Sequence, residues 1–176
     1  MVLKLNRLRV IPIHVPPVGA TMRADRRLAF EVLTAFEAVD SLRVIEHEGD
    51  RWLIEFHTPY PWFGRVHDFV TIESVTLTKP SRIEFSLVKA GKGLALLEDR
   101  FTFEDVDGST RFLYESTFGM SWSVVGWLFG KIVMEPLMKR HMRKHTAEVK
   151  AMIEARAEHS RVYPQRGTAS RSEPSP

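Results

Sequence analysis

The stretch L-L-E-D-R-F-T-F-E-D-V-D-G-S-T-R-F-L-Y-E-S-T-F, residues 96–118, alternates apolar and polar residues on both sides of the turn signal D-V-D-G-S. A period of two puts successive side chains on opposite faces of a β-strand, and short glycine-containing turns join antiparallel neighbours. We therefore expect a hairpin with one buried and one solvated face. The expected buried face contains Leu97, Asp99, Phe101, Phe103, Phe112, Tyr114, Ser116 and Phe118.

The same period extends the hairpin into a larger antiparallel sheet. Further strands are expected over residues 51–57, 65–78 and 83–87, with Phe85 on the buried face. A change of parity among the apolar residues near Ser74–Val75 indicates a β-bulge. The side chains expected to face water are Arg82, Glu84, Arg100, Glu104, Arg111 and Glu115.

A first strand over about residues 7–22 is expected at an edge of the sheet or with an interrupted course. Its three prolines, at positions 12, 16 and 17, have no N–H to donate to a central ladder.

Helical periodicity precedes and follows the other strands. Residues 24–37 predict a short amphipathic helix that begins near Asp25. Its expected apolar face consists of Leu28, Val32 and Ala35, with Phe36 adjoining. Residues 122–159 predict the cover of the sheet, as a long helix whose regular part spans about 137–157. Pro136 is expected to kink this segment or to mark the start of its regular part.

Composition indicates one globular domain over residues 1–159. The chain has 176 residues, of which 44% are hydrophobic and 27% charged. Residues 160–176 are expected to be a disordered tail, because almost no apolar side chain there offsets the entropy of ordering. The apolar run at 123–134 is too short to cross a bilayer. We expect a soluble, cytoplasmic protein, since the chain lacks a signal-peptide pattern and has no cysteine.

Charge is segregated along the chain. Residues 131–166 carry nine Lys/Arg against four acids, whereas residues 28–130 carry nine against sixteen. A solvated basic helix beside an acidic sheet explains this pattern, and transient contact with an anionic membrane surface is the alternative. Nucleic acid is not expected as a partner, because the basic residues lack interleaved aromatics and a recognised motif.

Four stretches resemble the START-related helix-grip superfamily, also called SRPBCC. They are A-T-M-R-A-D-R-R-L-A-F-E-V-L-T, K-P-S-R-I-E-F, L-L-E-D-R-F-T-F-E-D-V-D-G-S-T-R-F and L-M-K-R-H-M-R-K-H-T-A-E-V-K-A-M-I-E. The resemblance implies an α+β fold, in which a curved antiparallel β-sheet wraps around a long C-terminal α-helix. It also implies a hydrophobic cavity between sheet and helix. The second short helix typical of the superfamily is not evident, because residues 38–41 leave little room for it.

The expected ligand-binding residues come from strand parity, the long helix and the loop T-P-Y-P-W-F-G-R. They are Trp62, Phe63, Phe85, Asp99, Phe101, Phe103, Phe112, Tyr114, Phe118, Leu137 and His141. Asp99 is the one acid among them, and an inward carboxylate has a raised pKa unless it is paired. Its expected partner is His141, Tyr114 or an arginine, and a position at the solvated rim is the alternative.

Neither a metal nor a cofactor is expected. His141 and His145 have the i, i+4 spacing of a shared metal site, but zinc needs at least a third protein ligand and no H-E-x-x-H motif is present. The sequence A-G-K-G-L lacks the remaining residues of a phosphate-binding loop. Ser116 and Ser121 lack the context of a hydrolase nucleophile.

These observations favour a non-catalytic protein that binds or carries a hydrophobic small molecule such as a lipid, sterol or polyketide. Two alternatives stay open. One is an enzyme of the polyketide cyclase or dehydratase type that uses the same cavity, and the other is a protein-partner module. The oligomeric state does not follow from the sequence.

Overall fold

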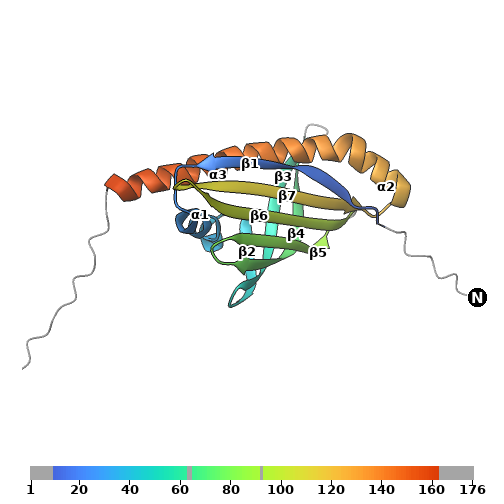
Figure 1. Ribbon diagram of the computed structural model, residues 1–176. Helices are drawn as coiled ribbons and strands as arrows, with labels where there is room; N and C mark the ends of the chain where they lie inside the picture. Colours follow the sequence, from blue (N-terminus) through green and yellow to red (C-terminus); the bar gives the residue numbers. More distant parts are fainter. Residues whose placement is uncertain (1–9, 63–64, 92, 163–176) are drawn as a thin grey trace, which may run out of the picture.

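The computed structural model describes residues 10–62, 65–91 and 93–162. A curved seven-stranded antiparallel sheet carries a long helical segment on its concave side (Figure 1). The strands lie in the order β1-β7-β6-β5-β4-β3-β2. The elements are β1 (Ile13–Met22), α1 (Arg26–Leu33), η1 (Phe36–Ala38), β2 (Leu42–Glu48), β3 (Arg51–Trp62), β4 (Arg65–Thr78), β5 (Arg82–Ala90), β6 (Leu94–Val106), β7 (Ser109–Met120), α2 (Ser123–Phe129), η2 (Gly130–Met134) and α3 (Glu135–Val162).

The β6–β7 hairpin follows the alternation of its sequence. The turn has positive φ angles at Asp107 (48°) and at Gly108 (75°). Glycine adopts this conformation without strain, and aspartate tolerates it better than most other residues do. All six aromatic residues expected on the inner face are buried: Phe85, Phe101, Phe103, Phe112, Tyr114 and Phe118. The charged residues of the outer face form cross-strand pairs, such as Arg100 with Glu84 at 3.1 Å. The predicted assignment of faces is therefore confirmed here.

Proline chemistry places β1 at the edge of the sheet. Its register against β7 shifts between Val15 and Val18, across Pro16 and Pro17. An edge strand tolerates this interruption because one side of its backbone has no neighbour. The expectation of an interrupted edge strand is confirmed, with the strand starting at Ile13.

The bulge expected at Ser74–Val75 lies elsewhere. In β4 the side chains of Thr71, Glu73, Val75 and Leu77 are all buried, so the alternation is regular through this point. The register between β4 and β5 shifts between Ile72 and Glu73 instead, and Val88 is the extra residue on β5. The apolar pattern misled because the inner face includes the polar pair Thr71 and Glu73.

Helix α1 begins at the predicted cap. The Asp25 carboxylate accepts a hydrogen bond of 2.9 Å from the Leu28 N–H, which satisfies an otherwise free donor at the helix start. The buried residues of α1 are Ala29 and Phe30, whereas Ala35 lies after the helix and is exposed. Leu28, Val32 and Phe36 pack on the core as predicted, so the expected apolar face was wrong only at Ala35 and lacked Ala29 and Phe30. Between α1 and β2, all of whose residues are described, no second short α-helix forms, and a three-residue 3₁₀ turn, η1, occupies its place.

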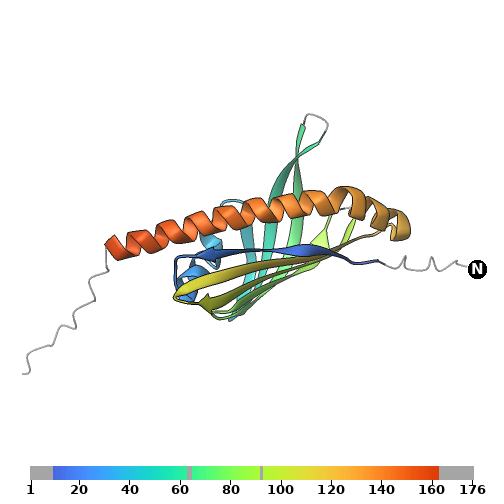
Figure 2. The same cartoon turned by 45° about the horizontal axis from the view of Figure 1, so that its top comes forward.

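The long helical segment is continuous from α2 through η2 to α3 (Figure 2). At η2 the backbone forms a π-helical turn in which the Glu135 N–H bonds to the Gly130 carbonyl. This turn immediately precedes Pro136, which has no N–H to donate. The segment continues to Val162, beyond the expected end of the regular helix. No helix within residues 10–62, 65–91 and 93–162 combines the length and apolar character needed to cross a membrane.

Two glycines fix where the long segment approaches the sheet. A Cβ atom on Gly130 would overlap the side chain of Ile13 and lie 3.3 Å from Phe118. A Cβ atom on Gly126 would lie 2.8 Å from the Cβ of Met120. Glycine at both positions therefore lets the start of the segment pack directly on β1 and β7.

Candidate functional site

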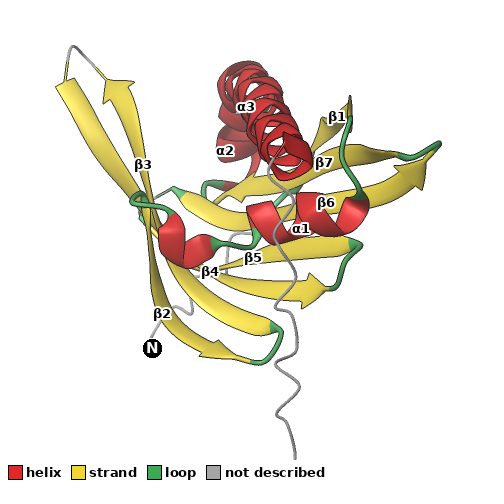
Figure 3. Cartoon of the chain, turned by 90° about the vertical axis from the view of Figure 1, so that its left-hand side faces the viewer, coloured by secondary structure: helices red, strands yellow, loops and turns green. Residues whose placement is uncertain are grey.

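The inner face of the sheet is only partly covered by α3. Figure 3 shows α3 above the β1–β7 side of the sheet, with β3 and β4 on the opposite side. Phe56 and Leu87 point inward, because each faces a buried cross-strand partner, Thr71 and Glu73 respectively. Both nevertheless remain half-buried. We take this accessible part of the inner face as the candidate site.

An aromatic cluster forms the floor of the site, with Phe101 at its centre. The Phe101 ring lies 5.0 Å from that of Phe85 and 4.7 Å from that of Tyr114, both edge to face. The Phe56 ring extends the cluster, at 6.0 Å from Phe85. Edge-to-face packing at these distances is favourable. Phe85, Phe101 and Tyr114 are buried, and Phe56 is the half-buried member of the cluster.

Asp99 lies within this apolar floor. Its carboxylate accepts a hydrogen bond of 2.8 Å from the Tyr114 hydroxyl through Oδ2. Its other oxygen, Oδ1, is buried without a protein hydrogen-bond partner, and so is the Ser116 hydroxyl directly across the strand pair. The inward position of Asp99 and its contact with Tyr114 confirm the sequence interpretation, and the expected alternative at the solvated rim is wrong.

A second inward carboxyl belongs to Glu73 on β4. The side chain of Glu73 is buried, and its Oε1 accepts a hydrogen bond of 2.7 Å from the Thr71 hydroxyl. Burial raises the pKa of Glu73 to about 7, and the nearby charge of Asp99 adds to the increase. A carboxyl with this pKa exchanges its proton near neutral pH, as a general acid or base must.

Burial perturbs the other titratable groups of the site as well. It raises the pKa of Asp99, against the opposing effects of the Ser116 and Tyr114 hydroxyls. It raises the pKa of Tyr114 well above its usual value, and the adjacent Asp99 carboxylate acts in the same direction. It lowers the pKa of His145, and His141 adds to that effect. Clusters of such perturbed groups are typical of functional sites.

The two histidines of α3 play different parts. Their rings stack with 6.1 Å between centroids. The His145 ring lies 5.8 Å from Phe101 and 6.1 Å from Tyr114, so it packs on the aromatic floor. His141 is exposed one turn away and reaches Asp99 only as a longer-range electrostatic influence. The sequence interpretation chose His141 for the site, whereas the structure puts His145 against the floor.

The remaining predicted residues divide into four groups. Phe103 and Phe112 are at most 1% exposed, and Phe103 packs on Phe30 of α1, so they belong to the central core. Phe118 is buried below the π-helical turn. Leu137 is 54% exposed and does not contribute a closed wall. The side chain of Trp62 and the whole of Phe63 lie outside the described residues.

Sequence reasoning missed Glu73, Thr71 and the contact of His145. The signal for Glu73 was its parity with Val75 and Leu77, two apolar residues further along β4. A strict period of two, continued backwards through the polar residues, would have placed Glu73 on the inner face.

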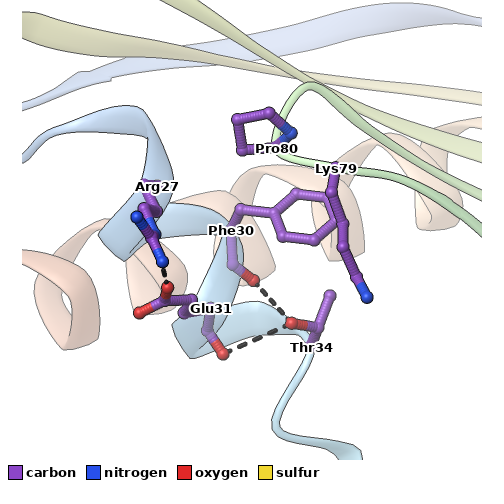
Figure 4. Close-up of a pocket in the computed structure, with 6 residues that line it drawn as sticks. All are labelled: Arg27, Phe30, Glu31, Thr34, Lys79 and Pro80. Atoms are coloured by element: carbon purple, nitrogen blue, oxygen red, sulfur yellow. Dashed lines mark hydrogen bonds and ion pairs between the residues drawn. The ribbon is translucent and has the colours of Figure 1, made fainter. Parts of the chain in front are cut away.

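A separate surface depression of about 570 Å³ lies beside α1. Figure 4 shows its lining, which includes Arg27 and Glu31 of α1, Thr34 just after this helix, and Lys79 and Pro80 of the β4–β5 turn. Its polar groups already have partners: Arg27 pairs with Glu31 at 3.0 Å, and Lys79 pairs with Asp50 at 2.7 Å. It therefore offers fewer unsatisfied groups to a ligand than the inner face of the sheet.

Among the described residues, no group of three or more His, Asp or Glu side chains is arranged to hold a metal ion. The absence of a zinc site at His141 and His145 stays a prediction.

Comparison with known proteins identifies the fold. No family model and no curated protein sequence matches the chain. TTHA0849 from Thermus thermophilus is 16% identical with a TM-score of 0.67, over 82% of this chain and 99% of that one. The Zhui aromatase/cyclase from Streptomyces sp. R1128 is 13% identical with a TM-score of 0.60, over 85% of this chain and 96% of that one.

A START superfamily protein from Mycobacterium smegmatis is 17% identical with a TM-score of 0.55, over 83% of this chain and 98% of that one. Likeness at these identities concerns the fold, since one fold supports many functions. It agrees with the curved sheet, the strand order and the long C-terminal helix described above. The chain therefore has the helix-grip fold that START-related proteins share.

Proposed function

We propose that this protein binds a small, largely apolar molecule on the inner face of its sheet, between α3 and the β3–β4 side, and acts as its carrier. The observation that carries the proposal is the pair of inward, half-buried side chains Phe56 and Leu87, which lie beside the aromatic cluster around Phe101 and a buried carboxyl. A surface that combines apolar side chains with a few convergent polar groups is typical of ligand sites. The fold supports the same reading, because its solved relatives include a START superfamily protein.

Adjacent residues of β5 provide a matched test. Leu87 points inward and is half-buried, whereas Val88 is the bulged residue and is 60% exposed. Leu87→Trp should fill the site and abolish uptake of a fluorescent naphthalene dye or fatty acid. Val88→Trp should leave uptake unchanged, because the same added volume lies outside the site. Equal dye binding by both variants and the unaltered protein would refute the proposed site.

An enzyme that moves protons is the second candidate, favoured by one specific observation. Glu73, with a pKa of about 7, lies in electrostatic range of Asp99 and its partner Tyr114. Polyketide cyclase or dehydratase chemistry needs such an acid–base group. With a poly-β-keto substrate mimic, Asp99→Asn and Glu73→Gln should then retain dye binding and lower turnover by about 10²–10⁴-fold. Turnover unaffected by both substitutions would refute this candidate.

The cellular setting is proposed from composition. The chain has no cysteine, which is compatible with the reducing cytoplasm, and we place the protein there. We also propose one domain over residues 1–159 with a C-terminal tail. A protein partner is the third reading. In a pull-down, the Leu87→Trp variant should still capture such a partner although its ligand site is filled, which separates the two readings.

A further inference from the structure

Few hydrogen-bond donors lie beside the two carboxyls of the floor. The Tyr114 hydroxyl proton is used on Asp99 Oδ2, and the Thr71 hydroxyl proton is used on Glu73 Oε1. Asp99 Oδ1 is buried without a well-formed hydrogen bond, and the Ser116 hydroxyl across the strand pair is the one remaining donor that acts on this carboxyl among the described residues. A buried acceptor without a partner costs about 1–3 kcal/mol, so a ligand that donates to it gains that energy.

The charged side chains of the floor are mainly acidic. Glu73 and Asp99 both point inward, and neither forms an ion pair with a lysine or arginine in the part of the chain that the structure describes. Tyr114, which carries no positive charge, interacts electrostatically with both acids, and the imidazole of His141 interacts with Asp99. Burial lowers the pKa of His145, which reduces its charge at neutral pH. Among the described residues, the site therefore has two acids and no permanent cation facing them.

We propose that the ligand presents a hydrogen-bond donor to Asp99 Oδ1, preferably a protonated amine, while its apolar body lies on Phe56 and Leu87 beside the aromatic cluster. This inference rests on the proposed function and names the chemical class of its ligand. An ammonium group supplies both the missing donor and the missing positive charge. A carboxylate supplies neither, and it adds a negative charge beside Asp99 and Glu73 in a site of low polarity.

A series of ligands with one chain length isolates the head group. Dodecylamine, dodecanol, 2-dodecanone and dodecanoate, each below its micellar concentration, would compete at pH 8 with a neutral naphthalene dye bound to the whole protein. All four have similar apolar bodies, so differences in Kd report the polar end. We expect dodecylamine to bind about 10–100-fold more tightly than dodecanoate, with dodecanol between them.

Two variants tie the preference to Asp99. Asp99→Asn removes the charge and should reduce the ratio of amine to carboxylate affinity at least tenfold. Glu98→Gln is the matched control, because Glu98 is the exposed neighbour on the same strand. It should leave the ratio unchanged.

The outcomes separate this inference from the function on which it rests. Dodecanoate binding as tightly as dodecylamine would overturn the amine preference and leave the apolar site intact. Tightest binding of 2-dodecanone would also overturn it, because a protonated Asp99 would then be the donor. Failure of all four compounds to displace the dye, or of the dye to bind, would overturn the proposed function itself.

An independent feature lies on the side of α2 and η2 that faces away from the sheet. Gly126 and Gly130 mark the side that packs on the strands. The apolar residues on the other sides are strongly exposed: Val124 by 64%, Val125 by 73%, Leu128 by 51% and Ile132 by 66%. These large apolar side chains lie close together along the segment and form a contiguous patch. Exposure of such a patch to water is unfavourable in free energy.

Basic residues continue this patch along the helix. Four cations follow within the first turns of α3, namely Lys139, Arg140, Arg143 and Lys144, and the last three are exposed. Lys144 pairs with Glu148 only at 3.6 Å on the surface. Apolar residues beside a group of cations are the complement of an anionic lipid surface. We infer that this side of the segment docks on anionic lipid, with the α2 side chains entering the headgroup region.

Vesicle co-sedimentation tests the inference. The protein should sediment with vesicles of phosphatidylcholine containing about 30% phosphatidylglycerol, and much less with pure phosphatidylcholine. Val125→Asp combined with Ile132→Asp, and separately Arg140→Glu combined with Arg143→Glu, should each reduce binding at least fivefold. Equal binding to both vesicle types would overturn the role of charge. Absence of binding together with a dimer in solution, lost in the Val125 and Ile132 variant, would assign the patch to a second copy instead.

Discussion

Replacing Glu73 with glutamine should make the protein more stable at neutral and alkaline pH and much less dependent on pH. Glu73 is 7% exposed, and its pKa of about 7 compares with an ordinary value of 4.5. The folded state thus holds this proton more tightly than the unfolded chain does. The contribution of protonated Glu73 to the free energy of unfolding is fully present below about pH 4.5. It declines as the pH rises to about 7 and stays at its lower level above that pH.

The size of the effect follows from the same two values. One pKa unit corresponds to about 1.4 kcal/mol, so ionised Glu73 costs the folded state about 3 kcal/mol at pH 8 and under about 1 kcal/mol at pH 5. Glutamine stays neutral, and its carbonyl oxygen accepts the same hydrogen bond from Thr71. The free energy of unfolding of Glu73→Gln should therefore exceed that of the unaltered protein by about 2 kcal/mol more at pH 8 than at pH 5.

Urea denaturation followed by far-UV circular dichroism at pH 5, 6, 7 and 8 measures this difference. His145, whose pKa burial lowers, gives stability that is lost as the pH falls below about 6.5. This contribution is common to both proteins and cancels in the comparison. Glu98→Gln on the exposed face is the control and should change stability little at any pH. A constant gap between Glu73→Gln and the unaltered protein across this range would refute the buried, protonated state of Glu73.

Three further results are expected from other parts of the molecule. In NMR titrations His57 should have a midpoint above 6.5, because its hydrogen bonds to two carboxylates raise its pKa, and His145 should have one below 6.5; coincident midpoints would contradict both environments. Gly130→Ala should lower the free energy of unfolding by about 1–3 kcal/mol, since the added methyl group overlaps Ile13; an unchanged urea midpoint would show that the segment shifts freely. Asp25→Ala should cost about 1 kcal/mol by removing the cap of α1, measured in the same way, and a neutral effect would contradict the capping role.

Local chemistry along the chain determined much of the fold. The alternation around Phe101 and Phe112 set the faces of β6 and β7, because strand geometry admits only two sides. Asp25 marked the start of α1 through its own capping bond. The prolines of β1 excluded a central position, since they have no N–H to share with a second neighbour. Each of these inferences depends on neighbours within a few residues.

Tertiary structure alone decided the composition of the site. Glu73 lies two strands away from Asp99, so their electrostatic interaction depends on the register of β4, β5 and β6 and on the bulge at Val88. His141 and His145 are equivalent by helical spacing, and only the position of α3 over the sheet puts His145 against the aromatic floor. That position depends in turn on close packing at two glycines, a contact between segments more than a hundred residues apart in the case of Gly130 and Ile13. Periodicity specifies which side of an element is buried, but packing between distant elements specifies what it is buried against.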